Sequence, residues 1–293
     1  MNIGFFAVGI GPSADPELIA LTAQTAEQCG FYSLWAPEHV VLLDQYASKY
    51  PYSQDGKLPM HTSVDILDPF TALTFAAAHS KRIRLGTGIC LVPERNPLVT
   101  AKEVASLDKL SGGRFDFGVG IGWLAEEFTA VGVPWERRAE RTREYLRAMK
   151  LLWTEEEPAF TGEFCSFPKV RMYPKPVQKP HPPIIFGGES TPALKRVAEV
   201  GDGWFGVNVT VEDARSKIAR IRQYAAAVGR DPSRFSFSVS PGLGVPVEID
   251  TIKRYRDAGV HQVVVGTIPR DPKGMREEIE RLAEKLVVPS ATL

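Results

Sequence analysis

Short apolar runs rich in Val, Ile, Leu and Phe alternate with longer amphipathic stretches along this chain. Near-continuous apolar strands are typical of a parallel sheet that helices cover on both faces. Eight such units in 293 residues predict one (β/α)8-barrel domain spanning residues 1–293, with a doubly wound open sheet as the alternative. The predicted strands are Ile3–Val8, Tyr32–Ala36, Ile83–Val92, Phe115–Val119, Pro183–Phe186, Gly203–Val207, Phe235–Ser240 and Gln262–Val265.

The predicted helices carry local start and stop signals. Asp15 and Pro16 are typical of an N-cap and a first helical residue, and Gly30 is typical of a stop. Asp68 is expected to cap the next helix in the same way. The predicted helices are Pro16–Gly30, Pro69–His79, Pro97–Leu110, Glu136–Trp153, Thr191–Val200, Val211–Val228, Ile249–Ala258 and Met275–Leu286.

Two segments interrupt the alternation, at about residues 40–66 and 155–182. Long loops inside a compact domain are usually binding loops or lids, or else disordered. The first insertion carries Tyr46, Tyr50 and Tyr52, and we predict that it closes over a substrate.

Charge and cysteine content narrow the function classes. The chain has 35 Lys and Arg against 35 Asp and Glu, so no net charge attracts nucleic acid or an anionic membrane, and a small-molecule substrate is favoured. Its three cysteines are far apart and lack zinc-ligand spacing, so we expect no metal and a reduced, cytoplasmic setting. We find neither a signal peptide pattern nor an apolar run of membrane-spanning length.

The ends of the predicted strands hold the candidate chemistry, because the active face of such a barrel lies there. Glu38 and His39 follow the second strand, and His39 is suited to shuttle a proton with Glu38 orienting it. Glycines at the ends of strands three and four, among them Gly88 and Gly120, allow a flat ring to approach the backbone. A bulge or a tight turn is the alternative explanation.

The fifth strand ends in Gly187-Gly188-Glu189-Ser190-Thr191-Pro192. Glycines, hydroxyls and a helix start place free N–H groups at a positive helix end, which predicts an anion site. Capping of the helix by Ser190 or Thr191 explains the same residues and is compatible with anion binding.

These pieces together resemble the luciferase-like flavin and deazaflavin oxidoreductases over nearly the whole chain. The blocks that carry the resemblance are SLWAPEHV, RIRLGTGICLVPERNPLVTAKEVASLDKLSGGRFDFGVGIGWLAEEF, PPIIFGGES and GDGW. The HVVLLDQYASKYPYS stretch is similar to the branch of probable coenzyme F420-dependent enzymes.

The resemblance implies a cofactor ring across the barrel mouth above a cis peptide at Gly88-Ile89, with Gly120 and Ile121 beside it. It also implies a cofactor phosphate at Gly187–Ser190, contact of His39 with ring or substrate, and a homodimer. Trp123 stands where relatives that act on sugar phosphates carry a catalytic Glu, so we place it with the substrate lid and expect a different substrate.

We therefore predict an oxidoreductase that uses reduced F420 for hydride transfer with a small organic substrate. The first alternative is an FMNH2-dependent monooxygenase that inserts one oxygen atom. A cofactor-free hydrolase using Glu38 and Glu126 and a non-enzymatic cofactor carrier are two further hypotheses.

Overall fold

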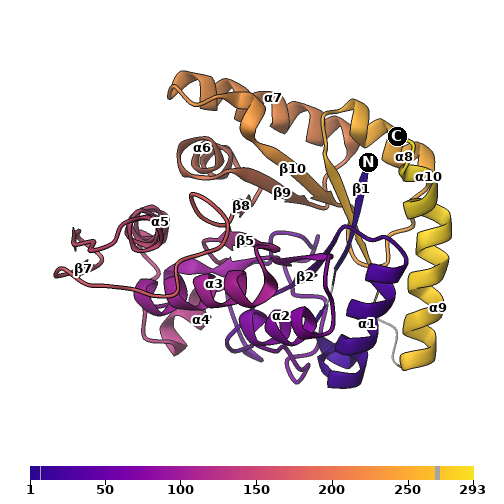
Figure 1. Ribbon diagram of the computed structural model, residues 1–293, viewed down its shortest axis with the longest axis horizontal. Coiled ribbons are helices and arrows are strands. Elements are labelled where there is room, and N and C mark those ends of the chain that lie inside the picture. Colours follow the sequence, from indigo (N-terminus) through magenta and orange to yellow (C-terminus); the bar gives the residue numbers. More distant parts are fainter. Residues whose placement is uncertain (7, 268–270) are drawn as a thin grey trace.

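The computed structural model of the protein describes residues 1–6, 8–267 and 271–293. Its parallel strands close into a barrel, because β3 pairs with β2 on one side and with β5 on the other (Figure 1). The predicted barrel is confirmed and the open sheet is wrong. The barrel strands are β1 (Asn2–Phe6), β2 (Ser33–Ala36), β3 (Arg84–Thr87) with β4 (Cys90–Leu91), β5 (Phe115–Gly120), β8 (Ile184–Gly187), β9 (Gly203–Val207), β10 (Ser236–Ser240) and β11 (Gln262–Gly266).

Two of the predicted strands differ from the observed ones by more than one residue at an end. The strand predicted over Ile3–Val8 is described only to Phe6, and Ala7 lies outside the described residues. The strand predicted over Ile83–Val92 consists of β3 and β4, which both pair with β5 but are separated by Gly88 and Ile89. The peptide bond between those two residues is cis, as the family resemblance implied.

The helices surround the barrel, and most lie within a few residues of their predicted bounds (Figure 1). Asp15 accepts hydrogen bonds from the N–H groups of Glu17 and Leu18, and Asp68 caps its helix at Thr71. The last helix begins at Pro272, earlier than predicted, because Asp271 caps it. The helices are α1 (Pro16–Gln28), α2 (Pro69–Ala78), α3 (Pro97–Ser111), α4 (Ala125–Ala130), α5 (Arg138–Thr154), α6 (Thr191–Val200), α7 (Val211–Ala227), α8 (Ile249–Asp257), α9 (Pro272–Leu282) and α10 (Val288–Ser290), with a π-helical turn over Ala283–Val287.

The core has two layers that follow from the alternation of side chains along each strand. Ile184 belongs to the large outer layer between strands and helices, whereas Ile185 belongs to a small inner cluster. Trp35 and Phe205 fill that inner cluster with their rings stacked 4.9 Å apart. The barrel interior is therefore packed, and ligands have access only at its ends.

The second insertion contains a small hairpin, β6 (Phe160–Thr161) and β7 (Ser166–Phe167), and is fastened where Asp108 accepts the N–H groups of Val177 and Gln178. The chain ends meet, since the amino group of Met1 donates to the carbonyl of Ser290 at 3.0 Å (Figure 1). Within the described ranges, no helix combines the length and hydropathy needed to cross a membrane.

Candidate active site

His39 lies just beyond the end of β2 and is held by a carboxylate far away in the sequence. Its Nδ1 is 2.7 Å from Oε2 of Glu127, which lies on α4 after β5. The other oxygen of Glu127 accepts the N–H groups of Val40 and Val41 at 2.6 and 3.2 Å. The side chain of Glu127 is only 1% exposed and that of His39 is 13% exposed. Glu127 therefore fixes the imidazole at a site that is nearly closed to solvent.

The other ring nitrogen of His39 faces Trp123. The indole Nε1 of Trp123 lies 3.4 Å from Nε2 of His39, and the two rings meet edge to face at 5.9 Å. An indole N–H can only donate, so Nε2 is the acceptor and the proton of the neutral ring resides on Nδ1, toward Glu127. A carboxylate that fixes the tautomer in this way leaves the opposite nitrogen as a proton acceptor.

The expected role of Glu38 in orienting His39 is wrong. Glu38 is buried, accepts a hydrogen bond from the N–H of Leu91 and forms an ion pair with Arg95. Nε of Arg95 lies 2.6 Å from Oε1 of Glu38, and the same guanidinium also pairs with Asp68 and Glu103. Burial raises the pKa of Glu38, although Arg95 and the Leu91 N–H oppose that effect. Glu38 thus joins β2 to β4 instead of contacting the imidazole.

The four residues assigned to the lid come together beside His39. Trp123 contacts Tyr46 and Tyr50 with ring centres 5.6 and 5.1 Å apart, and Tyr50 contacts Tyr52 at 5.5 Å. Offset and edge-to-face aromatic pairs of this kind add to the stability of a packed loop. The insertion predicted to cover the substrate therefore forms an aromatic wall at the barrel mouth.

Glu126 fastens this insertion to α4. Its carboxylate accepts the N–H of Ala47 at 2.6 Å and that of Ser48 at 3.2 Å, and the hydroxyl of Ser48 accepts the N–H of Ala125. Of the two carboxylates of the hydrolase hypothesis, Glu38 is thus bound by the Leu91 N–H and by Arg95. Glu126 is bound by backbone N–H groups at Oε1, whereas its buried Oε2 has no hydrogen-bond partner among the described residues. A pair used for glycoside hydrolysis has to keep its oxygens free for substrate, water and leaving group.

The anion loop after β8 has the predicted local structure. Ser190 caps α6 by accepting the N–H of Ala193, and Gly188 has a φ of 102°, which favours glycine. Nη2 of Arg220 donates to the Thr191 hydroxyl at 2.6 Å, so a cation from α7 adjoins the positive helix end. Capping is therefore observed, and the loop keeps the features of an anion site.

The side chain of Glu189 points elsewhere. Its carboxylate accepts the N–H of Val207 at 2.9 Å and is hydrogen-bonded to the hydroxyl of Tyr52. Burial raises the pKa of Glu189 in spite of these two donors. Glu189 thus links the lid to β9, and only its backbone belongs to the anion loop.

The glycines at the strand ends are explained by neighbouring side chains. A β-carbon on Gly120 would lie 1.6 Å from Cδ1 of Ile89, and one on Gly187 would lie 3.1 Å from its Cγ2. In β3, a β-carbon on Gly86 would lie 2.5 Å from the ring of Trp35. These glycines thus make room for Ile89 and Trp35, and the approach of a bound ring to the backbone at Gly88 and Gly120 stays a prediction. Ile89 then forms the platform of the mouth, with half-buried Ile121 following β5.

Two acidic residues of this site were missed by the sequence analysis. Glu126 was considered as a catalytic carboxylate and Glu127 was not, because the sequence does not show which of two adjacent carboxylates faces inward at the start of a helix.

Glu94 follows β4 in a short turn, and neither of its buried oxygens has a hydrogen-bond partner among the described residues. Burial, followed by the negative charges of Glu127 and Glu38, raises its pKa to about 9. A charged residue in an apolar strand-end turn was the only available signal.

Other candidate sites are structural. Cys90 is buried as predicted, and burial raises the pKa of its thiol, so it is not an activated nucleophile. No group of three metal-ligating side chains occurs among the described residues.

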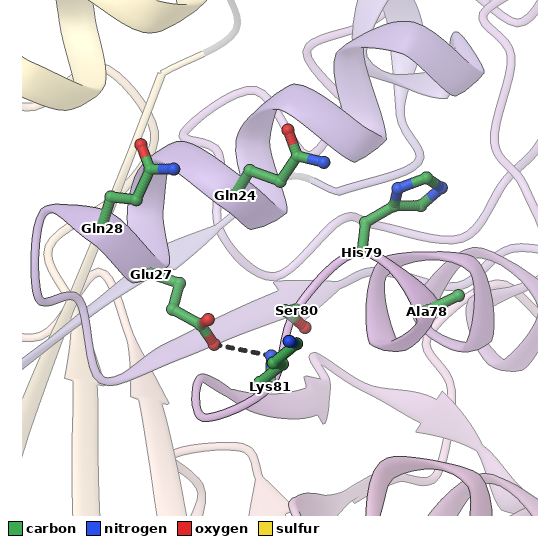
Figure 2. A pocket seen from close by; sticks show the side chains of 7 residues that line it. All are labelled: Gln24, Glu27, Gln28, Ala78, His79, Ser80 and Lys81. Carbon is green, nitrogen blue, oxygen red and sulfur yellow. Dashed lines mark hydrogen bonds between the residues drawn. The ribbon is translucent and has the colours of Figure 1, made fainter.

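A shallow hollow between α1 and the end of α2, near the start of β3, is lined by Gln24, Glu27, Gln28, Ala78, His79, Ser80 and Lys81 (Figure 2). It lies at the amino-terminal end of the barrel, where residues usually serve stability.

Comparison with known proteins identifies the family. Residues 3–248 match the luciferase-like monooxygenase family. An uncharacterised protein of Mycobacterium tuberculosis is 38% identical over 270 residues, covering 91% of this chain and 93% of its own length. The FMNH2-dependent dimethylsulfone monooxygenase of Pseudomonas putida is 33% identical over 210 residues, covering 71% of this chain and 53% of its own. An F420-dependent secondary alcohol dehydrogenase structure superposes with a TM-score of 0.78 over 98% of both chains at 19% identity. The chain therefore belongs to the luciferase-like monooxygenase family.

Proposed function

We propose that this protein is an F420-dependent oxidoreductase that transfers a hydride between the cofactor and a small organic substrate. The observation that carries the proposal is the buried pair of His39 and Glu127 at the barrel mouth, with the unprotonated Nε2 of His39 engaged by one long contact, 3.4 Å from Nε1 of Trp123. Hydride transfer at an alcohol or carbonyl carbon requires one proton to move on the oxygen, and a positioned imidazole is suited to that step. The fold likeness to an F420-dependent alcohol dehydrogenase agrees with this choice.

The residues at the mouth fit a ring with a phosphate-bearing tail. Ile89, on its cis peptide, provides an apolar platform where β5 and β8 end. The N-terminus of α6 provides backbone N–H groups at Ser190 and Thr191, and Arg220 adds a positive charge beside them. In our proposal Ile89 would support the ring, and the N-terminus of α6 would hold the phosphate. Bound F420 would supply a two-electron hydride donor or acceptor.

The residues of this chain supply position and proton transfer. When an alcohol is oxidised, Nε2 of His39 takes the hydroxyl proton, and Glu127 stabilises the imidazolium that results. When a carbonyl is reduced, the same Nε2–H returns the proton to oxygen. The wall of Tyr46, Tyr50 and Trp123 excludes water from the reacting atoms.

A second candidate is an FMNH2-dependent monooxygenase. The relative from Pseudomonas putida with that activity favours it, since its identity of 33% exceeds the 19% of the F420-dependent structure. The same platform and anion loop would accept FMN. The two candidates differ in the cofactor and in the need for oxygen.

Anaerobic titration of the purified protein with F420 and with FMN distinguishes these candidates. We expect F420 to bind at least about tenfold more tightly than FMN, which is a difference of about 1.4 kcal/mol. We then expect oxygen-independent bleaching or recovery of the F420 absorbance with a panel of small alcohols and ketones. Tighter FMN binding with oxygen-dependent turnover would favour the monooxygenase, and binding of neither cofactor would refute both.

A further inference from the structure

Arg196 on α6 is a buried cation that lacks a partner. The residue is only 5% exposed, and its buried Nε has no hydrogen-bond acceptor among the described residues. Within the same residues, its guanidinium forms no ion pair and no side-chain hydrogen bond. Buried polar groups are normally paired, and a buried charge without a counter-charge is strongly disfavoured. The guanidinium of Arg196 therefore requires an explanation other than the stability of the fold.

Arg196 faces α5, which lies beside α6 (Figure 1). Nε of Arg143 on α5 lies 2.8 Å from Oε2 of Glu199, and Glu199 follows Arg196 by one helical turn. Arg138 begins α5, and its Nε lies 3.4 Å from the carbonyl oxygen of Gly122 in the turn after β5. The side chain of Arg143 is 30% exposed, so this group of arginines reaches the surface between the two helices.

The surrounding charges leave Arg196 positive. Burial, followed by the positive charges of Arg143 and Arg138, lowers the pKa of Arg196 to about 10, so the guanidinium still carries its charge at neutral pH. Glu199 and Glu140 oppose this effect. The carboxylate of Glu199 is already held by Arg143, however, and Glu140 is exposed on α5. The positive charge of Arg196 is therefore available to an anion from outside the chain.

We propose that Arg196 and Arg138 form an oxyanion subsite between α5 and α6 that binds a phosphate or carboxylate group. A guanidinium presents N–H donors in a planar fork that matches the oxygens of these groups, and the resulting hydrogen bonds are assisted by charge. The subsite is separate from the anion loop at the α6 N-terminus, which Arg220 approaches from α7. A ligand with two anionic groups is thus met by cations on both sides of α6.

Two sources supply this chemistry. One is a free oxyanion such as inorganic phosphate, and its binding is independent of the proposed function. The other is the far end of the cofactor, which rests on the proposed function. The tail of F420 continues beyond its phosphate to carboxylate groups, whereas FMN ends at its phosphate.

Nitrogen-15 NMR of arginine side chains follows the Nε–H group of Arg196 directly in the wild-type protein without cofactor. Titration with inorganic phosphate should shift this signal until it saturates. Arg138→Met should weaken the phosphate affinity seen at Arg196 by about tenfold, since one charged donor is lost. Arg137→Met is the matched control and should leave that affinity unchanged, because Arg137 is exposed and pairs with Glu163. An Arg196 signal that does not respond to phosphate, or responds equally in Arg138→Met, would overturn the proposal.

Urea unfolding separates ligand binding from a structural role. Arg196→Met removes a buried cation that lacks a partner, so the variant should be at least as stable as the wild type in phosphate-free buffer. Phosphate should stabilise the wild type more than Arg196→Met, because a ligand that binds the folded state raises its stability. A variant that is less stable without phosphate and gains as much from it as the wild type would show that Arg196 serves the fold alone.

Affinities for F420 and FMN then distinguish the two sources. If the F420 tail occupies the subsite, Arg196→Met should bind F420 about tenfold more weakly and FMN equally well. An unchanged F420 affinity with a retained phosphate response would assign the subsite to a free oxyanion. If neither cofactor binds but Arg196 responds to phosphate, the proposed function fails and the subsite stands. If F420 binds and turns over but Arg196 responds to neither ligand, the subsite fails and the proposed function stands.

Discussion

Arg114 at one end of the barrel, and His39 and Glu94 at the other, differ in how many hydrogen-bond partners they have. At the amino-terminal end, the guanidinium of Arg114 donates to the carbonyls of Ala77, Ser80, Ile83 and Ser111 and to the Ser80 hydroxyl. At the carboxyl-terminal end, Nε2 of His39 meets one long contact, and both oxygens of Glu94 meet none among the described residues.

The difference shows which polar groups hold the fold and which remain for a ligand. Buried polar groups are normally paired, so an unpaired one at a strand end requires another explanation. A hollow in the surface is not by itself a sign of a ligand site. The hollow of Figure 2 lies at the amino-terminal end, where the carboxylate of Glu27 already accepts hydrogen bonds from the N–H groups of Lys81, Arg82 and Ile83. We therefore expect changes at the mouth to affect turnover and changes at the opposite end to affect stability.

Replacement of His39 by Asn should give the largest effect. We expect kcat/KM to fall by about 10²- to 10⁴-fold, because the side chain no longer transfers a proton, while F420 affinity is retained. The matched control is His79→Asn in the hollow at the other end, which should keep full activity. Anaerobic F420 absorbance assays with a responsive alcohol or ketone measure both. An active His39→Asn enzyme would remove the proton-transfer role.

Replacement of Arg114 by Met should leave four carbonyls and a hydroxyl without their donor. We expect the free energy of unfolding to drop by about 3 kcal/mol, while turnover per folded molecule stays unchanged. Urea unfolding measures the loss. An activity defect in the folded fraction would contradict the separation of the two ends.

Glu27→Gln should have a smaller, pH-dependent effect. Partial burial acts to raise the pKa of Glu27, but three backbone N–H donors hold it below the ordinary value. A lowered pKa in the folded state adds stability above the unfolded value of about 4.3, and this stability is lost as the pH falls through the folded pKa. The variant should be less stable by about 1 kcal/mol at pH 7. The gap between variant and wild type should close in urea titrations below about pH 4.

Tyr52→Phe should give the smallest effect. Removal of the hydroxyl breaks the link between the lid and Glu189, while the ring still packs on Tyr50. We expect the KM for the organic substrate to rise about two- to fivefold with little change in kcat, which is the size of effect expected for the loss of one hydrogen bond. Tyr173→Phe, on an exposed residue of the second insertion, is the control. An equal change in both variants would argue against a lid function.

Features that depend on neighbouring residues were predicted from the sequence more closely than features that depend on residues far apart in the chain. Caps such as Asp15 and Asp68 act within a few residues, so the helices were predicted closely. The hydrogen-bond partner of His39 was not predicted, because Glu127 is 88 residues away in the sequence. Glu38 was predicted in its place because it is adjacent to His39 in the chain. The glycines were visible, but the side chain that fills the space above them, Ile89, is set by three-dimensional packing.

The most direct test of the central claim is the equilibrium affinity for F420 of the wild type, Gly120→Ala and Arg114→Met, measured side by side on folded protein. A β-carbon at Gly120 would displace Ile89, the proposed platform, whereas Arg114 lies at the far end. The account predicts that the wild type and Arg114→Met bind equally and that Gly120→Ala binds at least about tenfold more weakly, or about 1.4 kcal/mol. Full affinity in Gly120→Ala, or an equal loss in Arg114→Met, would contradict a cofactor site at the mouth.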